Sequence, residues 1–348
     1  WSGWTSGPTS APGWGGMAPP PTGWHVPDVR PGVIALRPLG AGEIVDGAIT
    51  TVRKNPMATL GLAAIVGVVT ALGGLVASWI LSNQDAIVDP TATADELLDA
   101  LAVTLPVFGI ELLISWLSTV FLTGMLTVVV GQAVIGRHLT IGEAWSRARP
   151  RVWRLMGLTI VYTLLWLGTF LGVILASVVL GAVIGGEGGI GIFVIGLIAA
   201  LVLGVWLYVR FALAVPSLML ESETHGAGTR PVGLGRALGR SASLVRGSWW
   251  RTFGILLMIM IIGAIVTWAV NIPFQTIAGF ALTDPASLAD LSFGALVLAS
   301  VGQVIGTAIA APFIAAATVL LYIDLRIRRE GLDLELARAA GIDLPGRG

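Results

Sequence analysis

Six long apolar segments dominate the chain and predict an all-α integral membrane protein. A helix needs about 20 apolar residues to cross the hydrocarbon core of a bilayer, and each segment is long enough. The second, fourth and sixth exceed this length, so we expect them to tilt, kink or protrude. The segments lie near Met57–Leu81, Leu101–Ile135, Leu155–Ile184, Ile190–Leu220, Phe253–Leu282 and Leu291–Ile323.

Polar tails flank this apolar domain, which we place at residues 39–325. Residues 1–38 are rich in Pro, Gly, Ser, Thr and Trp and cannot bury a core, so we predict a disordered cytoplasmic tail. Residues 326–348 form a second cytoplasmic tail. Only 11% of the whole chain is charged, whereas 55% is hydrophobic. These charges are too few to cover a water-facing surface of this size, which again indicates a membrane protein.

Basic residues are confined to the two tails and to alternate connections between the apolar segments. Of the 20 Lys and Arg residues, only Arg210 lies within an apolar segment. The other connections carry acids, such as Asp85, Glu187 and Asp284, and no Lys or Arg. By the positive-inside rule, this pattern predicts a multi-pass protein of the cell (inner) membrane with both termini in the cytoplasm.

The polar stretch that precedes an apolar hairpin recurs along the chain. Val232–Gly254 aligns without gaps with Leu39–Gly61, and Leu139–Gly157 is a shorter third copy. We therefore predict three parallel repeats, each a surface helix followed by a helical hairpin. Because parallel repeats are related by an axis along the membrane normal, we expect a pseudo-threefold six-helix bundle. The repeats span residues 39–135, 139–220 and 232–323.

In the third copy, apolar side chains gather on one helical face and arginines on the other, as in an amphipathic helix. The basic face consists of Arg236, Arg240, Arg246 and Arg251. We expect this helix to lie in the membrane interface, with the arginines against anionic lipid headgroups. A docking surface for a membrane or cytoplasmic protein is the alternative. Nucleic acid is not an expected partner, because the basic stretch is tethered between two apolar segments.

Two ionisable residues lie inside apolar segments. A charged side chain in a membrane is costly, so each of them is a candidate functional residue. They are Glu111 and Arg210. One interpretation is an ion pair that fixes helix packing. In a second, Arg210 binds a lipid phosphate or an anionic substrate, because a guanidinium fits phosphate. In a third, each side chain extends to the nearest interface.

Uncharged polar residues form a second set of candidates within the apolar segments. They are Asn271 and Gln275, on either side of Pro273, and Gln303. A helix broken at Pro273 would expose carbonyl groups that line a cavity. The other interpretation is hydrogen bonding between helices, which is common for Asn and Gln in membranes.

The residues required by familiar enzyme classes are scarce. The chain has no Cys, and its histidines, His25, His138 and His225, are far apart and fall in no motif. We therefore predict no catalytic residues, no metal site and no cofactor.

Two stretches, Leu36–Pro56 and Leu320–Leu336, together with Val209–Glu221, resemble actinobacterial membrane proteins labelled "glycerophosphoryl diester phosphodiesterase membrane domain". The resemblance covers roughly residues 33–337. It implies a multi-pass inner-membrane protein, and the label comes from proteins that fuse such a module to a phosphodiesterase barrel. This chain has no room for such a barrel beside its six apolar segments, and it lacks the clustered His, Glu and Asp residues that the barrel requires. The resemblance therefore implies no enzymatic activity here.

Two functions are compatible with these features. We expect a non-enzymatic scaffold or accessory subunit that recruits partners at the cytoplasmic face of the membrane. The alternative is a lipid-binding or transport protein with a cavity between the repeats.

Overall fold

The computed structural model describes residues 37–81, 93–134, 136–225, 228–278 and 293–330, and this part is almost entirely helical. Six of its helical segments are long and apolar enough to cross a membrane, which confirms the prediction of an all-helical protein with six spanning segments. Most of both predicted tails, at 1–36 and 331–348, and the acidic connections at 82–92 and 279–292 lie outside the described residues.

The spanning helices form three antiparallel hairpins in chain order. A π-helical turn at Met57–Gly61 leads into the first helix. The helices are α2 (Leu62–Leu81), α3 (Ala94–Val134), α5 (Val152–Ile184), α6 (Gly186–Phe211), α9 (Trp249–Ile277) and α10 (Phe293–Glu330). With 41 residues, α3 is about 60 Å long, twice the thickness of the hydrocarbon core. The helix α10 continues five residues past the expected start of the C-terminal tail.

Shorter elements lie between the hairpins. The helices are α1 (Ala41–Lys54), α4 (Ile141–Ala148), α7 (Ala214–Leu220) and α8 (Leu234–Val245). A 3-10 turn joins α4 to α5. Strands β1 (Ser222–His225) and β2 (Gly228–Pro231) form an antiparallel hairpin in which Ser222 is opposite Pro231.

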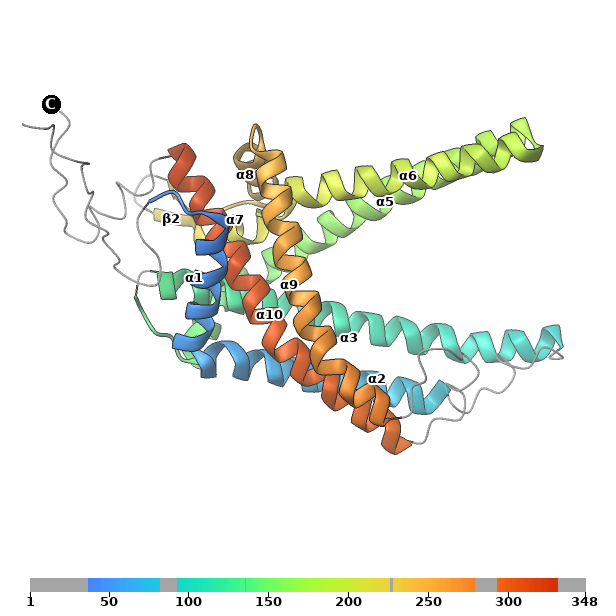
Figure 1. Cartoon of the computed structure of the whole chain (residues 1–348), viewed down its shortest axis with the longest axis horizontal. Coiled ribbons are helices and arrows are strands. Elements are labelled where there is room, and N and C mark those ends of the chain that lie inside the picture. Colours follow the sequence, from blue (N-terminus) through green and yellow to red (C-terminus); the bar gives the residue numbers. More distant parts are fainter. Residues whose placement is uncertain (1–36, 82–92, 135, 226–227, 279–292, 331–348) are drawn as a thin grey trace, which may run out of the picture.

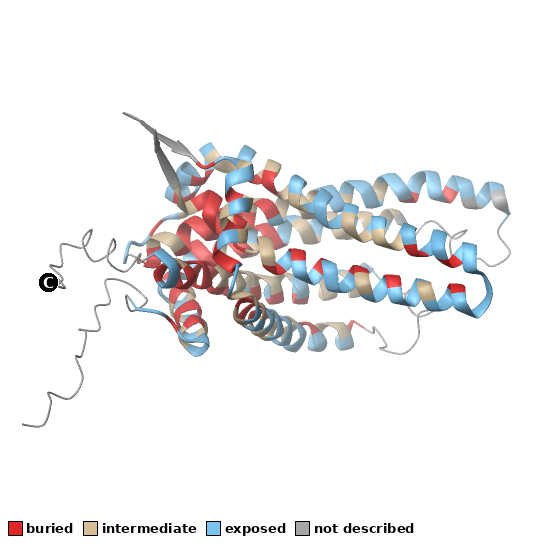
Figure 2. Ribbon diagram, turned by 90° about the horizontal axis from the view of Figure 1, so that it is seen from above, coloured by how far each residue is buried: buried red, intermediate tan, exposed pale blue. Residues whose placement is uncertain are grey.

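The three hairpins meet at one end of the molecule, which we call the basal end and define as α1, α4, α7, α8 and the last turns of α10. Figure 1 shows that the α5–α6 hairpin diverges from the other two as it leaves this end. Figure 2 shows buried residues concentrated at the basal end and exposed ones along the hairpins. The six helices therefore share a packed base, and their distal parts diverge.

Glycine allows α5 and α6 to pack closely within their hairpin. A Cβ atom added at Gly196 would lie 2.2 Å from the Cβ of Ser177, and one at Gly189 would lie 2.4 Å from the carbonyl oxygen of Gly181. Contact this close requires residues without a side chain, as in other membrane helix pairs. Direct backbone contact therefore joins the two helices of this hairpin.

A buried carboxylate joins three elements at the basal end. The side chain of Asp324 on α10 is 0% exposed and accepts hydrogen bonds from Arg251 Nη1 at 2.6 Å and Arg328 Nε at 2.9 Å. It also accepts from the backbone N–H of Leu39 at 2.8 Å. The same two arginines donate to the Leu39 carbonyl oxygen, at 2.8 and 2.9 Å. We call this group, Leu39, Arg251, Asp324 and Arg328, the Leu39 clasp.

A hydroxyl group satisfies the backbone where the fourth spanning segment is interrupted. The helix α6 ends at Phe211, and α7 begins at Ala214. Ser241 on α8 donates to the Arg210 carbonyl oxygen at 2.8 Å and accepts from the Leu213 N–H at 3.2 Å. An interrupted helix at membrane depth requires such partners for its freed backbone groups. Ser241 of α8 therefore stabilises the interruption between α6 and α7.

We predict that Asp324→Asn destabilises the protein by about 1–3 kcal/mol, because removing one partner from a buried ion pair leaves the other charges unpaired. Water reduces this cost, since the side chains of Arg251 and Arg328 are 31% and 37% exposed. Thermal unfolding in detergent, followed by tryptophan fluorescence, measures the change. Asp46→Asn, at an exposed position on α1, is the matched control. Equal midpoints for both variants would show that the clasp contributes nothing.

Candidate ligand cavity

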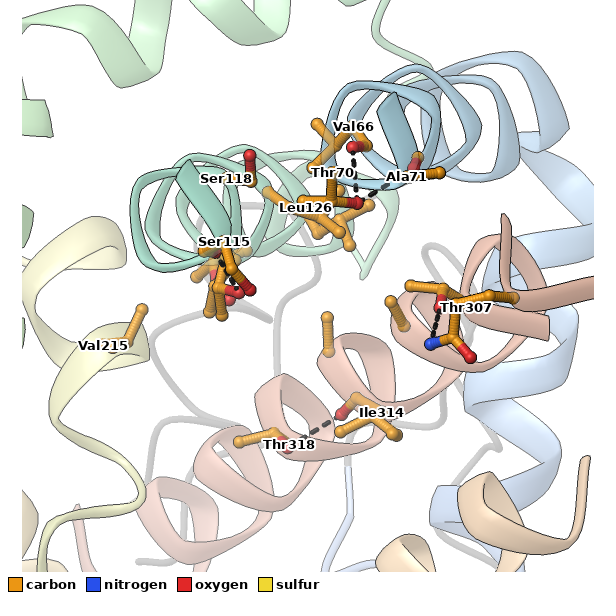
Figure 3. Close-up of a pocket in the computed structure, with 18 of the residues that line it drawn as sticks. Val66, Thr70, Ala71, Ser115, Ser118, Leu126, Val215, Thr307, Ile314 and Thr318 are labelled. Atoms are coloured by element: carbon orange, nitrogen blue, oxygen red, sulfur yellow. Dashed lines mark hydrogen bonds between the residues drawn. The ribbon is translucent and has the colours of Figure 1, made fainter. Parts of the chain in front are cut away.

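A cavity of about 650 Å³ lies between the first and third hairpins. Its walls come from α2, α3 and α10, and residues Ala212, Val215 and Pro216 close one side. Figure 3 shows this space with Ser115 on α3, Thr307 and Thr318 on α10, and Val215 on α7 around it. The volume falls within the range of small-molecule binding sites.

The contribution of α3 is a regular polar stripe. Glu111, Ser115, Thr119, Thr123 and Thr127 recur at every fourth residue, and all line the cavity. Residues four apart are neighbours on a helix, so these five side chains form a continuous row that winds slowly around α3. Sixteen residues separate the first from the last, which corresponds to about 24 Å at 1.5 Å per residue. We call this set the α3 polar stripe, and it runs along most of the thickness of a membrane core.

Similar rows of small and polar residues on α2 and α10 complete the wall. On α2 the row is Thr70, Gly74 and Ser78, again four residues apart. On α10 the row is Ser300, Gln303, Thr307, Ala311, Ala315 and Thr318. Three helices thus turn polar rows toward the same space, which apolar residues such as Val66 and Leu122 also line. Polar faces in this arrangement require water or a polar ligand between them.

The cavity is open in its distal half and closed at its basal end. Glu111 and Ser115 are partly exposed, while Thr119 and Gln303 are exposed. Toward the basal end, Leu126, Thr127, Pro216 and Val319 are buried. The helix interruption before α7 therefore forms the floor of the cavity, and the Ser241 bonds fix that floor in place.

Half of the ten hydroxyls in the lining already donate a hydrogen bond within the protein. Five lining hydroxyls donate to carbonyl oxygens of their own helices: Thr70, Thr119, Thr127, Ser300 and Thr318. The Gln303 amide donates to the Thr307 hydroxyl at 3.3 Å. A hydroxyl that donates to a backbone carbonyl keeps its oxygen lone pairs. The cavity therefore presents acceptor oxygens from all of its hydroxyls and free donors from about half of them.

Of the polar residues predicted from the sequence, the fold brings two together. Glu111 and Gln303 line the same cavity although they are far apart in the chain. Arg210 lies outside the cavity lining, and its guanidinium is 4.9 Å from the ring centroid of Trp206 on the same helix, a cation–π geometry. The three residues therefore do not form one polar site.

Asn271 and Gln275 also lie outside the cavity. The helix α9 continues through Pro273 to Ile277, so of the two interpretations of these residues, the broken helix is wrong. Asn271 Nδ2 donates to the Thr267 carbonyl oxygen at 2.9 Å, and this amide lies where a Cβ on Gly306 of α10 would clash, at 2.8 Å. Gln275 is half-buried on the same helix. The absence of a side chain at Gly306 thus allows α9 and α10 to approach at Asn271.

The predicted basic face is divided among different roles. Arg240 Nε contacts Glu221 at 3.0 Å and Arg240 Nη2 contacts Glu330 at 2.6 Å. Tyr322 also donates to Glu221. Burial opposes the charge of Arg240, but hydrogen bonds and charges from both glutamates outweigh it and raise the pKa of the guanidinium.

The other three arginines of that face lie in different surroundings. Arg251 belongs to the Leu39 clasp. Arg236 and Arg246 are exposed at the basal surface. The Arg246 carbonyl oxygen accepts a hydrogen bond from Arg329 on α10. Two of the four arginines, Arg240 and Arg251, therefore form ion pairs within the basal end. This differs from the expectation that the whole basic face lies against lipid headgroups.

The α3 polar stripe was missed by the sequence analysis, which considered charged and amide residues only. The signal was present as a spacing of four residues from Glu111 to Thr127 within an apolar segment. Single Ser and Thr residues are unremarkable in membrane helices, whereas a run of five polar positions in one row indicates a polar lumen.

Family models, curated proteins and solved structures contain no match to this chain. The family resemblance stated above therefore remains a prediction. The class of the protein follows from its fold alone: a helical protein with six helices able to span a membrane and a cavity of mixed polar and apolar lining between them.

Because the chain has no Cys, single substitutions report water access directly. We predict that Ser115→Cys and Thr119→Cys react with a charged, membrane-impermeant thiosulfonate in liposomes, because thiolate forms only where water reaches. Leu117→Cys, on the opposite face of the same helix, is the matched control. We expect its rate to be lower by at least about tenfold. Equal rates at the three positions would contradict a water-filled cavity.

Proposed function

We propose that the protein binds a membrane lipid in this cavity and moves the polar head of the lipid along the α3 polar stripe. The observation that carries the proposal is a polar wall about 24 Å long inside membrane-spanning helices. A carboxylate within a membrane-spanning helix is costly and indicates function, and Glu111 stands at one end of this wall.

The mixed character of the cavity favours a lipid over a small soluble solute. Apolar residues such as Val66, Leu122 and Ile314 alternate with the polar rows around the same space. The exposure of Thr119 and Gln303 connects the polar wall to the outer surface of the helices, which the membrane covers. A lipid suits both features, because its head can follow the hydroxyls while its chains remain in the bilayer.

The scaffold hypothesis has weaker support than this one. It requires basic residues that are available to partners, but Arg240 and Arg251 are engaged with Glu221, Glu330 and Asp324 of the same chain. It also leaves the polar stripe without a role. The lipid hypothesis accounts for that stripe.

We propose further that the hairpins are three related parallel units. In support, α1, α4 and α8 begin after N-cap residues Gly40, Thr140 and Gly233 with nearly identical backbone angles, φ −78° to −76° and ψ 158° to 165°. Glu43 accepts from the backbone N–H of Gly40 at 2.7 Å, as Glu143 does from that of Thr140 at 2.8 Å.

A second match concerns the start of each hairpin. Aligning Gly61, Gly157 and Gly254 places Met57, Trp153 and Trp250 at one equivalent position. Their exposures are 78%, 79% and 77%. Large side chains exposed at the start of each hairpin are typical of the membrane interface. With the positive-inside rule, this supports a basal end at the cytoplasmic surface, with α1, α4 and α8 lying along it.

A single substitution can fill the cavity with little disturbance to packing. A Cβ atom at Gly74 would meet only Glu111 Oε1, at 3.9 Å, so Gly74→Leu fits and projects into the cavity. We expect this variant to retain at least about tenfold less lipid than the wild type. Native mass spectrometry after gentle extraction measures the retained lipid. Gly168→Leu, at an exposed position of α5 with open space around it, is the control.

Each outcome of this experiment decides between the hypotheses. Loss of one lipid class in Gly74→Leu and its retention in Gly168→Leu supports binding in the cavity. Equal lipid retention by all three proteins contradicts the proposal. A stoichiometric protein partner without a retained lipid supports the scaffold.

A further inference from the structure

We propose that the head of the bound lipid is an uncharged polyol, such as a sugar or a glycerol with free hydroxyls. This inference rests on the proposed function and specifies its ligand. It follows from which hydrogen-bonding groups the cavity leaves available and from the charge of its lining.

The hydrogen-bonding groups of the lining favour a ligand whose groups both donate and accept. Hydroxyls such as Thr119 and Thr127 have directed their protons to the Ser115 and Thr123 carbonyl oxygens. Their oxygen lone pairs, and those of Glu111, remain as acceptors toward the cavity. A ligand hydroxyl donates to such oxygens. It can also accept from any hydroxyl that rotates toward it, so a polyol satisfies both kinds of group.

The charge of the lining disfavours an anionic head. Among the described residues around the cavity, Glu111 is the only ionisable side chain, and neither Lys nor Arg lines this space. A phosphate in a low-dielectric site requires cationic partners, and beside a carboxylate it meets repulsion. Arg210 lies outside the lining and beside Trp206. The cavity therefore selects against anionic phospholipids.

The position of Glu111 also disfavours a cationic head. This carboxylate lies at the open, distal end of the α3 polar stripe, where it is partly exposed. From Ser115 to Thr127 the stripe is uncharged, and it ends at Thr127, which is buried. Burial of a cation there without a paired anion is costly. A neutral head with several hydroxyls is the class that can occupy the whole length of the stripe.

The test uses the purified full chain in detergent with three lipids that share the same acyl chains. They are a monoglycosyl diacylglycerol, phosphatidylglycerol and a trimethylammonium lipid. Native mass spectrometry measures retention, counted as the difference between the wild type and Gly74→Leu. We expect the retention of the glycosyl lipid to exceed that of each of the other two lipids by at least about fivefold. This is the factor in affinity that one net hydrogen bond supplies.

Two variants separate the roles of the stripe. Thr119→Val with Thr123→Val removes two acceptor oxygens, and we expect glycosyl-lipid retention to fall by about fivefold or more. Thr169→Val on α5 is the matched control, since its hydroxyl donates to the Leu165 carbonyl oxygen in the same way, outside the cavity. Glu111→Gln keeps an acceptor oxygen, so retention of the glycosyl lipid stays within about twofold.

Several results would overturn the polyol head. One is greater retention of phosphatidylglycerol than of the glycosyl lipid. Another is preferred retention of the trimethylammonium lipid that is lost in Glu111→Gln. Both results leave lipid binding itself intact. If none of the three lipids differs between the wild type and Gly74→Leu, the cavity does not bind lipid, and the proposed function fails with the inference.

Discussion

The buried carboxylate of Asp324 is the constraint on which the rest of the structure depends. A charge with no access to water is stable only when cations and hydrogen-bond donors surround it. Here Arg251 comes from α9, Arg328 from α10 itself, and a backbone N–H from Leu39 just before α1. Each donor lies in a different part of the chain, so satisfying Asp324 fixes the start of the first unit against the third hairpin. The Glu221 contacts with Arg240 and Tyr322 extend the same principle to α7 and α8.

A polar base of this kind allows the membrane-spanning parts to diverge. In a membrane, lipid tails are as apolar as leucine, so apolar helix faces gain little by packing against one another. The α5–α6 hairpin is therefore stable through its own glycine contacts and need not contact the distal halves of the others. The first and third hairpins, held at their bases, leave the polar cavity between them. Ion pairing at one end and weak association at the other together account for a cavity that is closed basally and open distally.

The sequence was sufficient for the spanning helices and not for the cavity. Length and hydropathy identify segments such as Phe253–Leu282 without any tertiary information, because the bilayer imposes its own length requirement. Pro273 was misleading, since its missing N–H is tolerated within α9. Asp324 was visible as a charge near Arg326 and Arg328, but its contact with Leu39 connects residues 285 positions apart and cannot be inferred from local spacing. Likewise, Glu111 and Gln303 were separate candidates until the fold placed them on one wall.

The separation of charge within the molecule bears on which lipid chemistry each part can recognise. The basal end holds exposed cations such as Arg236 and Arg246, and these suit anionic headgroups at the membrane surface. The cavity holds hydroxyls and one carboxylate and suits neither an anion nor a buried cation. The basal surface therefore suits anionic lipids, whereas the cavity disfavours them. These two preferences are compatible if the anionic lipids only position the protein, while an uncharged polyol lipid enters the space between α2, α3 and α10.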